Sequence, residues 1–187
     1  MAVNQVSLFF YPPRWKQRLT PDPRARTDEG KPVQLVDAVP VRGAAAAPLF
    51  PDAVKGWLAE RNFTPVEWGR GSVFERGQVR SIFGPEKEIE VSVGEEAGEV
   101  TKLYCRFTLP RHNPPPLAAW AGFAAELCGR FGLRLGAEGV APCGAAEFLT
   151  AVRGHRFYRE FAASFGWGVA STEPAADGGG TSAFPAS

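Results

Sequence analysis

Histidine and cysteine are scarce in this chain of 187 residues. It has two histidines, His112 and His155, and three cysteines, Cys105, Cys128 and Cys143, which lie far apart in the sequence. A zinc site built from several histidines is therefore impossible, and no Cys-x-x-Cys pair indicates a metal or redox motif. Cysteines among apolar neighbours predict buried, reduced thiols, which are typical of cytosolic proteins.

Charge of one sign is also scarce, because the net charge is only +1 at pH 7. This near-neutrality disfavours nucleic acid and anionic membranes as partners. No apolar run approaches the roughly 18 residues of a membrane span, and the amino terminus lacks the pattern of a signal peptide. The composition is rich in Arg, Ala, Gly and Pro, as in proteins of GC-rich bacterial genomes. We therefore expect a cytoplasmic protein of bacterial type.

Motifs for cofactors and catalytic nucleophiles are missing. Gly69-Arg70-Gly71 lacks the Gly-Lys-Ser/Thr end of a phosphate loop, and no serine lies in a Gly-x-Ser-x-Gly elbow. The glutamates from Glu86 to Glu99 alternate along a strand, which indicates a solvated face rather than a calcium site or an acid–base pair. We expect no cofactor, no metal, no catalytic residue and no small-molecule ligand, so an enzyme is the less favoured class.

The chain does have a clear change of hydrophobic period. Odd-numbered apolar residues from Ile89 to Val93 and from Leu103 to Leu109 alternate with polar ones, as in half-buried strands. Their shared parity predicts a hairpin whose register keeps odd residues on one face. Beyond Asn113-Pro114 the apolar spacing becomes three to four, which predicts a helix capped by Asn113 and ended by Gly132.

Other elements follow from composition and turn residues. Residues 3–10 and 33–41 are predicted strands, whereas the Pro- and Arg-rich segment of about residues 11–32 is a predicted long loop. Residues 51–62 form a predicted short helix, and residues 72–83 a predicted hairpin around Arg76-Gly77.

The carboxy-terminal part completes the expected architecture. A second helical region begins near Gly144 and breaks at Gly154, because glycine is unfavourable inside a helix. The sequence thus predicts one α+β domain over residues 1–169, with an antiparallel, meander-like sheet packed on one face by carboxy-terminal helices. Residues 170–187 form a predicted disordered tail, because they are rich in Gly, Ser, Ala and Pro.

Two charged surfaces are the binding candidates. The first is a basic loop segment with an aromatic centre, and the second is the acidic outer face of the predicted hairpin. Their members are Arg14, Trp15, Lys16 and Arg18 in the basic segment and Glu86, Glu88 and Glu90 on the acidic face.

A third candidate lies where a strand passes into a helix. Arg111-His112-Asn113 occupies this junction, and backbone N–H groups at such junctions bind anions. The alternative hypothesis is therefore a small enzyme that uses His112, with Arg111 and Asn113 holding an anionic substrate.

From Ser72 to Trp167, strands are followed by helices rich in Trp and Phe. This order is similar in layout to that of small bacterial immunity proteins, which neutralise a toxin. The likeness implies that another protein is the partner. The sequence hypothesis is accordingly a non-catalytic protein-binding module, immunity-like and acting by surface recognition.

Overall fold

A computed structural model describes residues 4–27, 30–66, 72–81, 84–111, 113–136, 139 and 142–167. The strands are β1 (Gln5–Tyr11), β2 (Trp15–Arg26), β3 (Pro32–Pro40), β4 (Thr64–Val66), β5 (Ser72–Arg76), β6 (Val79–Ser81), β7 (Gly84–Glu86), β8 (Ile89–Glu96), β9 (Glu99–Thr108) and β10 (Arg134–Leu135). The helices are α1 (Pro51–Ala59), α2 (Leu117–Phe131), α3 (Ala145–Gly154) and α4 (Arg156–Phe165).

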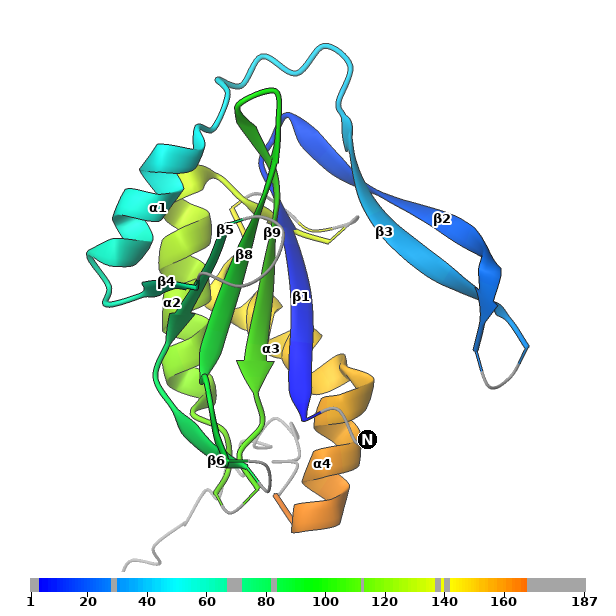
Figure 1. Ribbon diagram of the computed structural model, residues 1–187, viewed down its shortest axis with the longest axis vertical. Coiled ribbons are helices and arrows are strands. Elements are labelled where there is room, and N and C mark those ends of the chain that lie inside the picture. The colour runs from blue at the N-terminus through cyan, green and yellow to red at the C-terminus, as the bar shows by residue number, and fades with distance from the viewer. Residues whose placement is uncertain are drawn as a thin grey trace, which may run out of the picture.

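The predicted α+β class is confirmed. Six strands form one antiparallel sheet in the order β10-β1-β9-β8-β5-β4, and α2 and α3 lie behind it in Figure 1. The apolar opening strand β1 lies inside this sheet, between β10 and β9. Because helices pack on one side, the core forms between them and the side chains of the strands that point toward them.

The predicted register of the central hairpin is also confirmed. Ile89 pairs with Phe107, Val91 with Cys105 and Val93 with Leu103, and all six side chains are buried. A slip of one residue would turn these apolar side chains away from the helices, so burial of one face determines the pairing.

Several helix ends agree with the sequence. Gly132 ends α2 in the left-handed conformation, at φ 65°, which glycine adopts without steric cost. The break predicted at Gly154 separates α3 from α4. The predicted start of α2 at Asn113 is wrong, because the helix begins only at Leu117. Three consecutive prolines precede Leu117, and each disfavours the helical conformation of the residue before it.

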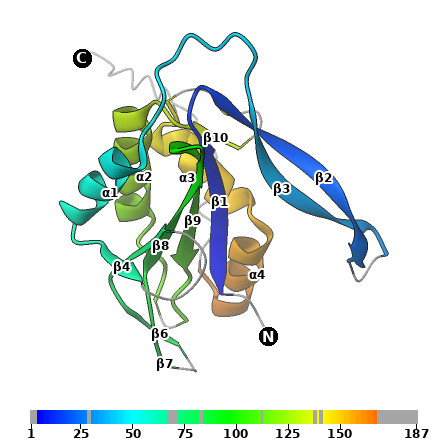
Figure 2. The same ribbon diagram turned by 45° about the horizontal axis from the view of Figure 1, so that its top comes forward.

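Two predictions for the first half of the chain are wrong. Residues 15–26 are not part of a loop but form β2, which pairs with β3 in a two-stranded sheet. The two strands stand out from the body in Figures 1 and 2, and we call them the arm.

The predicted 72–83 hairpin does not form either, since β5 pairs with β4 and β8, whereas β6 pairs with β7. Composition indicated turns correctly but could not choose the partner strands.

The predicted tail at 170–187 lies outside the described residues. Within the part of the chain that the structure describes, no helix has the length and apolar character needed to cross a membrane.

Candidate functional site

The arm is attached to the body by side chains at its base. Trp15 is buried, and its indole Nε1 donates a hydrogen bond to Glu99 Oε1 at 3.1 Å. Arg14 Nε lies 3.3 Å from the same oxygen in an ion pair. Of the predicted basic segment, Arg14 and Trp15 therefore serve as anchors of the arm, and their polar groups are directed toward the body.

Two cations from the body hold the backbone of the arm. Arg134 Nη2 donates to the carbonyl oxygens of Pro13 and Trp15, at 3.3 and 2.8 Å. Lys102 Nζ donates to the carbonyl oxygen of Val36 in β3 at 2.9 Å. Hydrogen bonds with a charged donor are stronger than neutral ones, so these contacts fix both strands near the body.

Tyr11 lies at the same junction and is fully buried. Burial raises the pKa of its phenol to about 12, and the charge of Asp37 in β3 acts in the same direction. The phenol therefore stays neutral at physiological pH. The base of the arm is thus a packed and largely desolvated joint.

The register of the arm separates its side chains onto two faces. Residues that pair directly across an antiparallel ladder share a face, and successive residues alternate. The first face carries Trp15, Gln17, Leu19 and Pro21 of β2 with Gln34, Val36, Ala38 and Pro40 of β3. The second face carries Lys16, Arg18 and Thr20 of β2 with Leu35, Asp37 and Val39 of β3.

These two faces differ in charge. Over the paired residues 15–21 and 34–40, all of which the structure describes, the first face has no charged side chain, and we call it the uncharged face. The second, which we call the charged face, presents an exposed Lys16 and an Arg18–Asp37 ion pair at 3.7 Å. Both partners of that pair are more than half exposed, so it adds little to stability.

Each face also exposes one large apolar side chain. Leu19 on the uncharged face is 53% exposed, and Leu35 on the charged face is 48% exposed. Outside the arm, Phe50 and Phe165 are exposed to a similar degree, at 59% and 43%, whereas most large apolar side chains of the body are buried. Sequence reasoning missed Leu19 because its neighbours have the composition of a loop.

The predicted acidic surface does not form as expected. Glu88 was expected to be exposed on the outer face, but its Oε1 accepts a hydrogen bond from Trp120 Nε1 of α2 at 3.2 Å. Strand β8 begins only at Ile89, so strand alternation does not orient Glu88. Glu90 does lie opposite Arg106, as the register predicts, but it is buried, with only 7% of its surface exposed. Glu86 belongs to β7, and its side chain lies outside the described residues.

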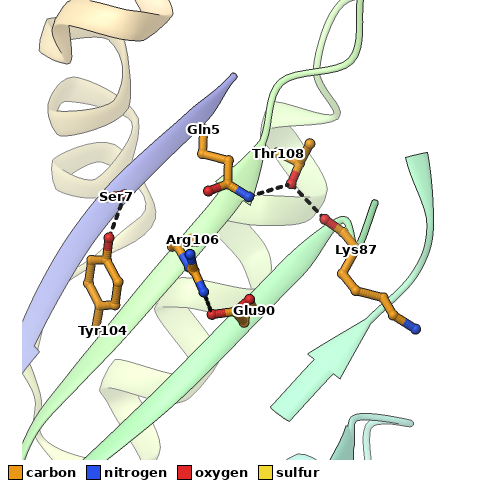
Figure 3. A network of polar contacts seen from close by, with 7 residues as sticks. All are labelled: Gln5, Ser7, Lys87, Glu90, Tyr104, Arg106 and Thr108. Atoms are coloured by element: carbon orange, nitrogen blue, oxygen red, sulfur yellow. Dashed lines mark hydrogen bonds and ion pairs between the residues drawn. The ribbon is translucent and has the colours of Figure 1, made fainter. Parts of the chain in front are cut away.

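Glu90 belongs to a polar network on the side of the sheet opposite the core (Figure 3). It forms an ion pair with Arg106. Burial lowers the pKa of the Arg106 guanidinium, and the negative charge of Glu75 acts in the opposite direction. On the neighbouring strand, Tyr104 Oη donates to Ser7 Oγ at 3.0 Å. The carboxylate of Glu90 is thus paired with Arg106, although the buried Nε of Arg106 has no hydrogen-bond partner among the described residues. Glu90 therefore does not contribute to an open acidic patch.

The enzyme hypothesis centred on the junction before α2. His112 lies outside the described residues. Arg111 is half-buried and Asn113 is exposed, and Asn113 does not cap α2. The Nε of Arg111 is buried without a hydrogen-bond partner in the described part of the chain, and the anion-binding role of this junction stays a prediction.

His155 has a structural role at the start of α4. It is the N-cap of α4, and its Nδ1 accepts a hydrogen bond from the backbone N–H of Phe157 at 3.3 Å. Burial lowers the pKa of this imidazole. The neutral form, which can accept that hydrogen bond, is thereby favoured.

The three cysteines are buried, as predicted. Cys128 shares a hydrogen bond with Cys143, and this contact together with burial raises the pKa of its thiol. Burial also raises the pKa of Cys105. All three are free thiols in the core, and the raised pKa values of Cys105 and Cys128 disfavour the reactive thiolate. Among the described residues, no group of three or more His, Cys, Asp or Glu side chains is arranged to hold a metal ion.

Comparison of the chain with protein-family models, with curated proteins and with solved structures gives no match. A function for the arm must therefore be argued from its own geometry and chemistry.

Proposed function

We propose that this chain is a non-catalytic protein-binding module that contacts another protein through its arm. The observation that carries the proposal is the arm itself, which stands out from the body (Figure 2). Its charged face carries Lys16 and Arg18, and the exposed Leu35 lies toward its outer end. Exposed apolar side chains bordered by polar ones are typical of protein interaction sites.

The attachment of the arm supports this role. Trp15, Arg134 and Lys102 hold the base of the arm on the body, so the outer part is presented in a defined direction. A preorganised binding element loses less conformational entropy on association than a mobile loop does. Leu35 supplies apolar contact area, and Lys16 and Arg18 attract a partner with an acidic surface.

In its specific form, the proposal is that this chain is a toxin-neutralising, immunity-like protein of the bacterial cytoplasm. The layout of strands and helices over residues 72–167 supports this form, as do the three free thiols. The partner would then be a toxin with an acidic patch that receives the charged face.

The experiment is affinity purification from the native host with matched charge variants. The test variant combines Lys16→Glu and Arg18→Glu on the arm. The control combines Arg153→Glu and Arg159→Glu, two exposed arginines on α3 and α4. We expect one enriched protein that is lost with the arm variant and retained with the control. Equal capture by both variants would contradict recognition through the arm.

The captured partner then tests the toxin-neutralising form. Expressed alone in a bacterial host, it should arrest growth, and co-expression of this chain should restore growth. The arm variant should fail to restore it. A partner that is harmless when expressed alone would exclude this form and leave the binding module in place.

A further inference from the structure

Two of the three buried cysteines lie side by side in the core. Cys128 belongs to the last turn of α2, Cys143 lies just before α3, and their side chains share a hydrogen bond. The backbone supports the same arrangement through Leu133. This residue donates its N–H to the carbonyl oxygen of Cys128 at 3.0 Å, and its own carbonyl oxygen accepts from the N–H of Cys143 at 2.9 Å. Side-chain and backbone contacts therefore agree in placing the two thiols together.

Cys105 lies near this pair but is held differently. It pairs with Leu8 on one side and with Val91 on the other, so two ladders of the central sheet fix its backbone. The hydrogen bond of Cys128 goes to Cys143, whereas Cys105 acts on Cys128 through charge. Cys143 lies outside the helices and strands, and irregular chain adjusts its backbone more readily than a paired strand does.

We infer that Cys128 and Cys143 are a modification site, which a small disulfide oxidant converts into an intramolecular disulfide between α2 and the segment before α3. A disulfide forms where two cysteine side chains already point toward each other, as a hydrogen bond between them requires. The bond would close the chain over residues 129–142. This stretch includes Arg134, which holds two backbone carbonyl groups at the base of the arm. Oxidation would therefore restrain the segment that anchors the arm.

The reaction begins at Cys143, because its irregular segment opens locally more readily than α2 does. The sulfur of Cys143 attacks one sulfur of the oxidant, the S–S bond of the oxidant breaks, and a first thiol is released. The sulfur of Cys128 then attacks Cys143 in this mixed disulfide and releases a second thiol. Two S–H bonds break and one S–S bond forms, and the two protons and two electrons leave with the two released thiols.

Burial determines how fast this bond forms and how long it lasts. Cys128 is 0% exposed and Cys143 1% exposed, so the folded chain reacts only through local opening. The same burial protects the disulfide from reducing thiols once it has formed. In a reducing compartment the pair stays as two thiols. The inference does not depend on the proposed function, because neither cysteine lies on the arm.

Peptide mapping of the wild-type full chain tests the pairing. The purified protein is treated with one equivalent of dipyridyl disulfide, which is small and uncharged, and the remaining thiols are blocked with N-ethylmaleimide in denaturant. Trypsin cleaves between the cysteines, so each falls in its own peptide, with residues 103–106, 112–130 and 135–153. We expect a linked pair of 112–130 with 135–153, whereas 103–106 carries the maleimide.

The mass of the intact protein identifies the bond as intramolecular. The oxidised monomer should lose the mass of two hydrogen atoms and carry no pyridyl group. Recovery of all three peptides unlinked, a link that includes Cys105, or a link between two chains would overturn the inference.

Thermal unfolding tests the effect of the bond. Each protein is measured before and after oxidation, so the effect of a substitution on stability cancels. The test variant is Cys143→Ala, and the matched control is Cys105→Ala, which removes a buried cysteine outside the pair. Closing a loop of this length restricts the unfolded chain, so oxidation should raise the Tm of the wild type and of Cys105→Ala by about 5 °C or more. Cys143→Ala should shift by less than about 1 °C.

An equal rise in Cys143→Ala, or a linked wild-type chain whose Tm does not rise, would contradict the inference. The mapping and the wild-type comparison need no substitution, so they decide the question even where a variant does not fold.

Discussion

Phe107 shows at the scale of one residue how the sheet and the helices share a core. Its ring lies 5.2 Å from that of Trp120 in α2 and 5.1 Å from that of Phe148 in α3, between centroids. A third neighbour, Phe123, lies at 6.5 Å. Aromatic contacts at these distances add directional packing to the burial of apolar area. Phe107 therefore links β9 to two helices at once.

Truncation of this side chain tests the core. Phe107→Ala should lower the free energy of unfolding by about 3–5 kcal/mol, because it leaves a cavity among three aromatic rings. Phe50→Ala is the matched control, since Phe50 is 59% exposed, and it should cost less than about 0.5 kcal/mol. Chemical denaturation of both variants measures the difference. Similar losses for the two would show that Phe107 does not join the layers.

His155 makes stability depend on pH. Burial lowers its pKa in the folded state below the ordinary value of about 6.5, so the unfolded chain binds the proton more tightly. The contribution of His155 is therefore present above about pH 6.5 and is lost as the pH falls toward the folded-state pKa. Protonation also removes the acceptor for the N–H of Phe157. His155→Asn keeps a capping acceptor that does not titrate in this range.

Thermal unfolding from pH 7.5 to pH 5 compares the two proteins. The wild-type chain should lose more stability than His155→Asn over this interval. Parallel curves would mean that His155 has the same pKa in the folded and unfolded states.

At the scale of elements, the arm shows why composition alone misleads. Residues 15–26 contain prolines and arginines with few apolar side chains, which is typical of a loop. They form a strand because β3 supplies its hydrogen bonds, and because the two prolines lie where the ladder ends or is irregular. Pairing across the chain outweighs local preference, as strand propensities depend strongly on context.

The anchor of the arm makes a prediction about this element. Glu99→Ala removes the acceptor of the Trp15 indole and the ion-pair partner of Arg14. Amide hydrogens of β2 and β3 should then exchange faster, whereas those of α2 should keep their protection. Glu96→Ala is the control, because Glu96 is exposed near the same turn. Hydrogen-exchange mass spectrometry resolves these segments. Unchanged exchange rates in β2 and β3 would mean that the contacts of Glu99 are not needed to hold the arm on the body.

At the scale of the whole molecule, the charged residues are distributed differently from the sequence expectation. Of the expected acidic surface, Glu88 and Glu90 bond to Trp120 and Arg106, whereas Lys16 and Arg18 of the expected basic surface are exposed on the arm. We therefore expect Lys16 and Arg18 to supply the electrostatic attraction between the arm and an acidic partner.

Recognition by this charge predicts a specific salt dependence. Lys16→Glu with Arg18→Glu should slow association with the partner about tenfold or more at low ionic strength, because electrostatic steering acts on the association rate. The effect should fade as salt shortens the Debye length to about 10 Å at 0.1 M. Arg153→Glu with Arg159→Glu, and separately His112→Ala, should leave the rate nearly unchanged. Loss of activity in His112→Ala alone would favour the enzyme hypothesis instead.

The sequence by itself determined the α+β class, the register of β8 on β9, the end of α2 and the break between α3 and α4. Each of these follows from a local period or from a single glycine, and neighbouring residues are sufficient to express it. Only the tertiary structure decided that residues 15–26 pair with β3, that Glu88 bonds to Trp120 and that Trp15 anchors the arm. Those outcomes join residues far apart in the chain, as Trp15 and Glu99 are, and their energies depend on burial that exists only after folding.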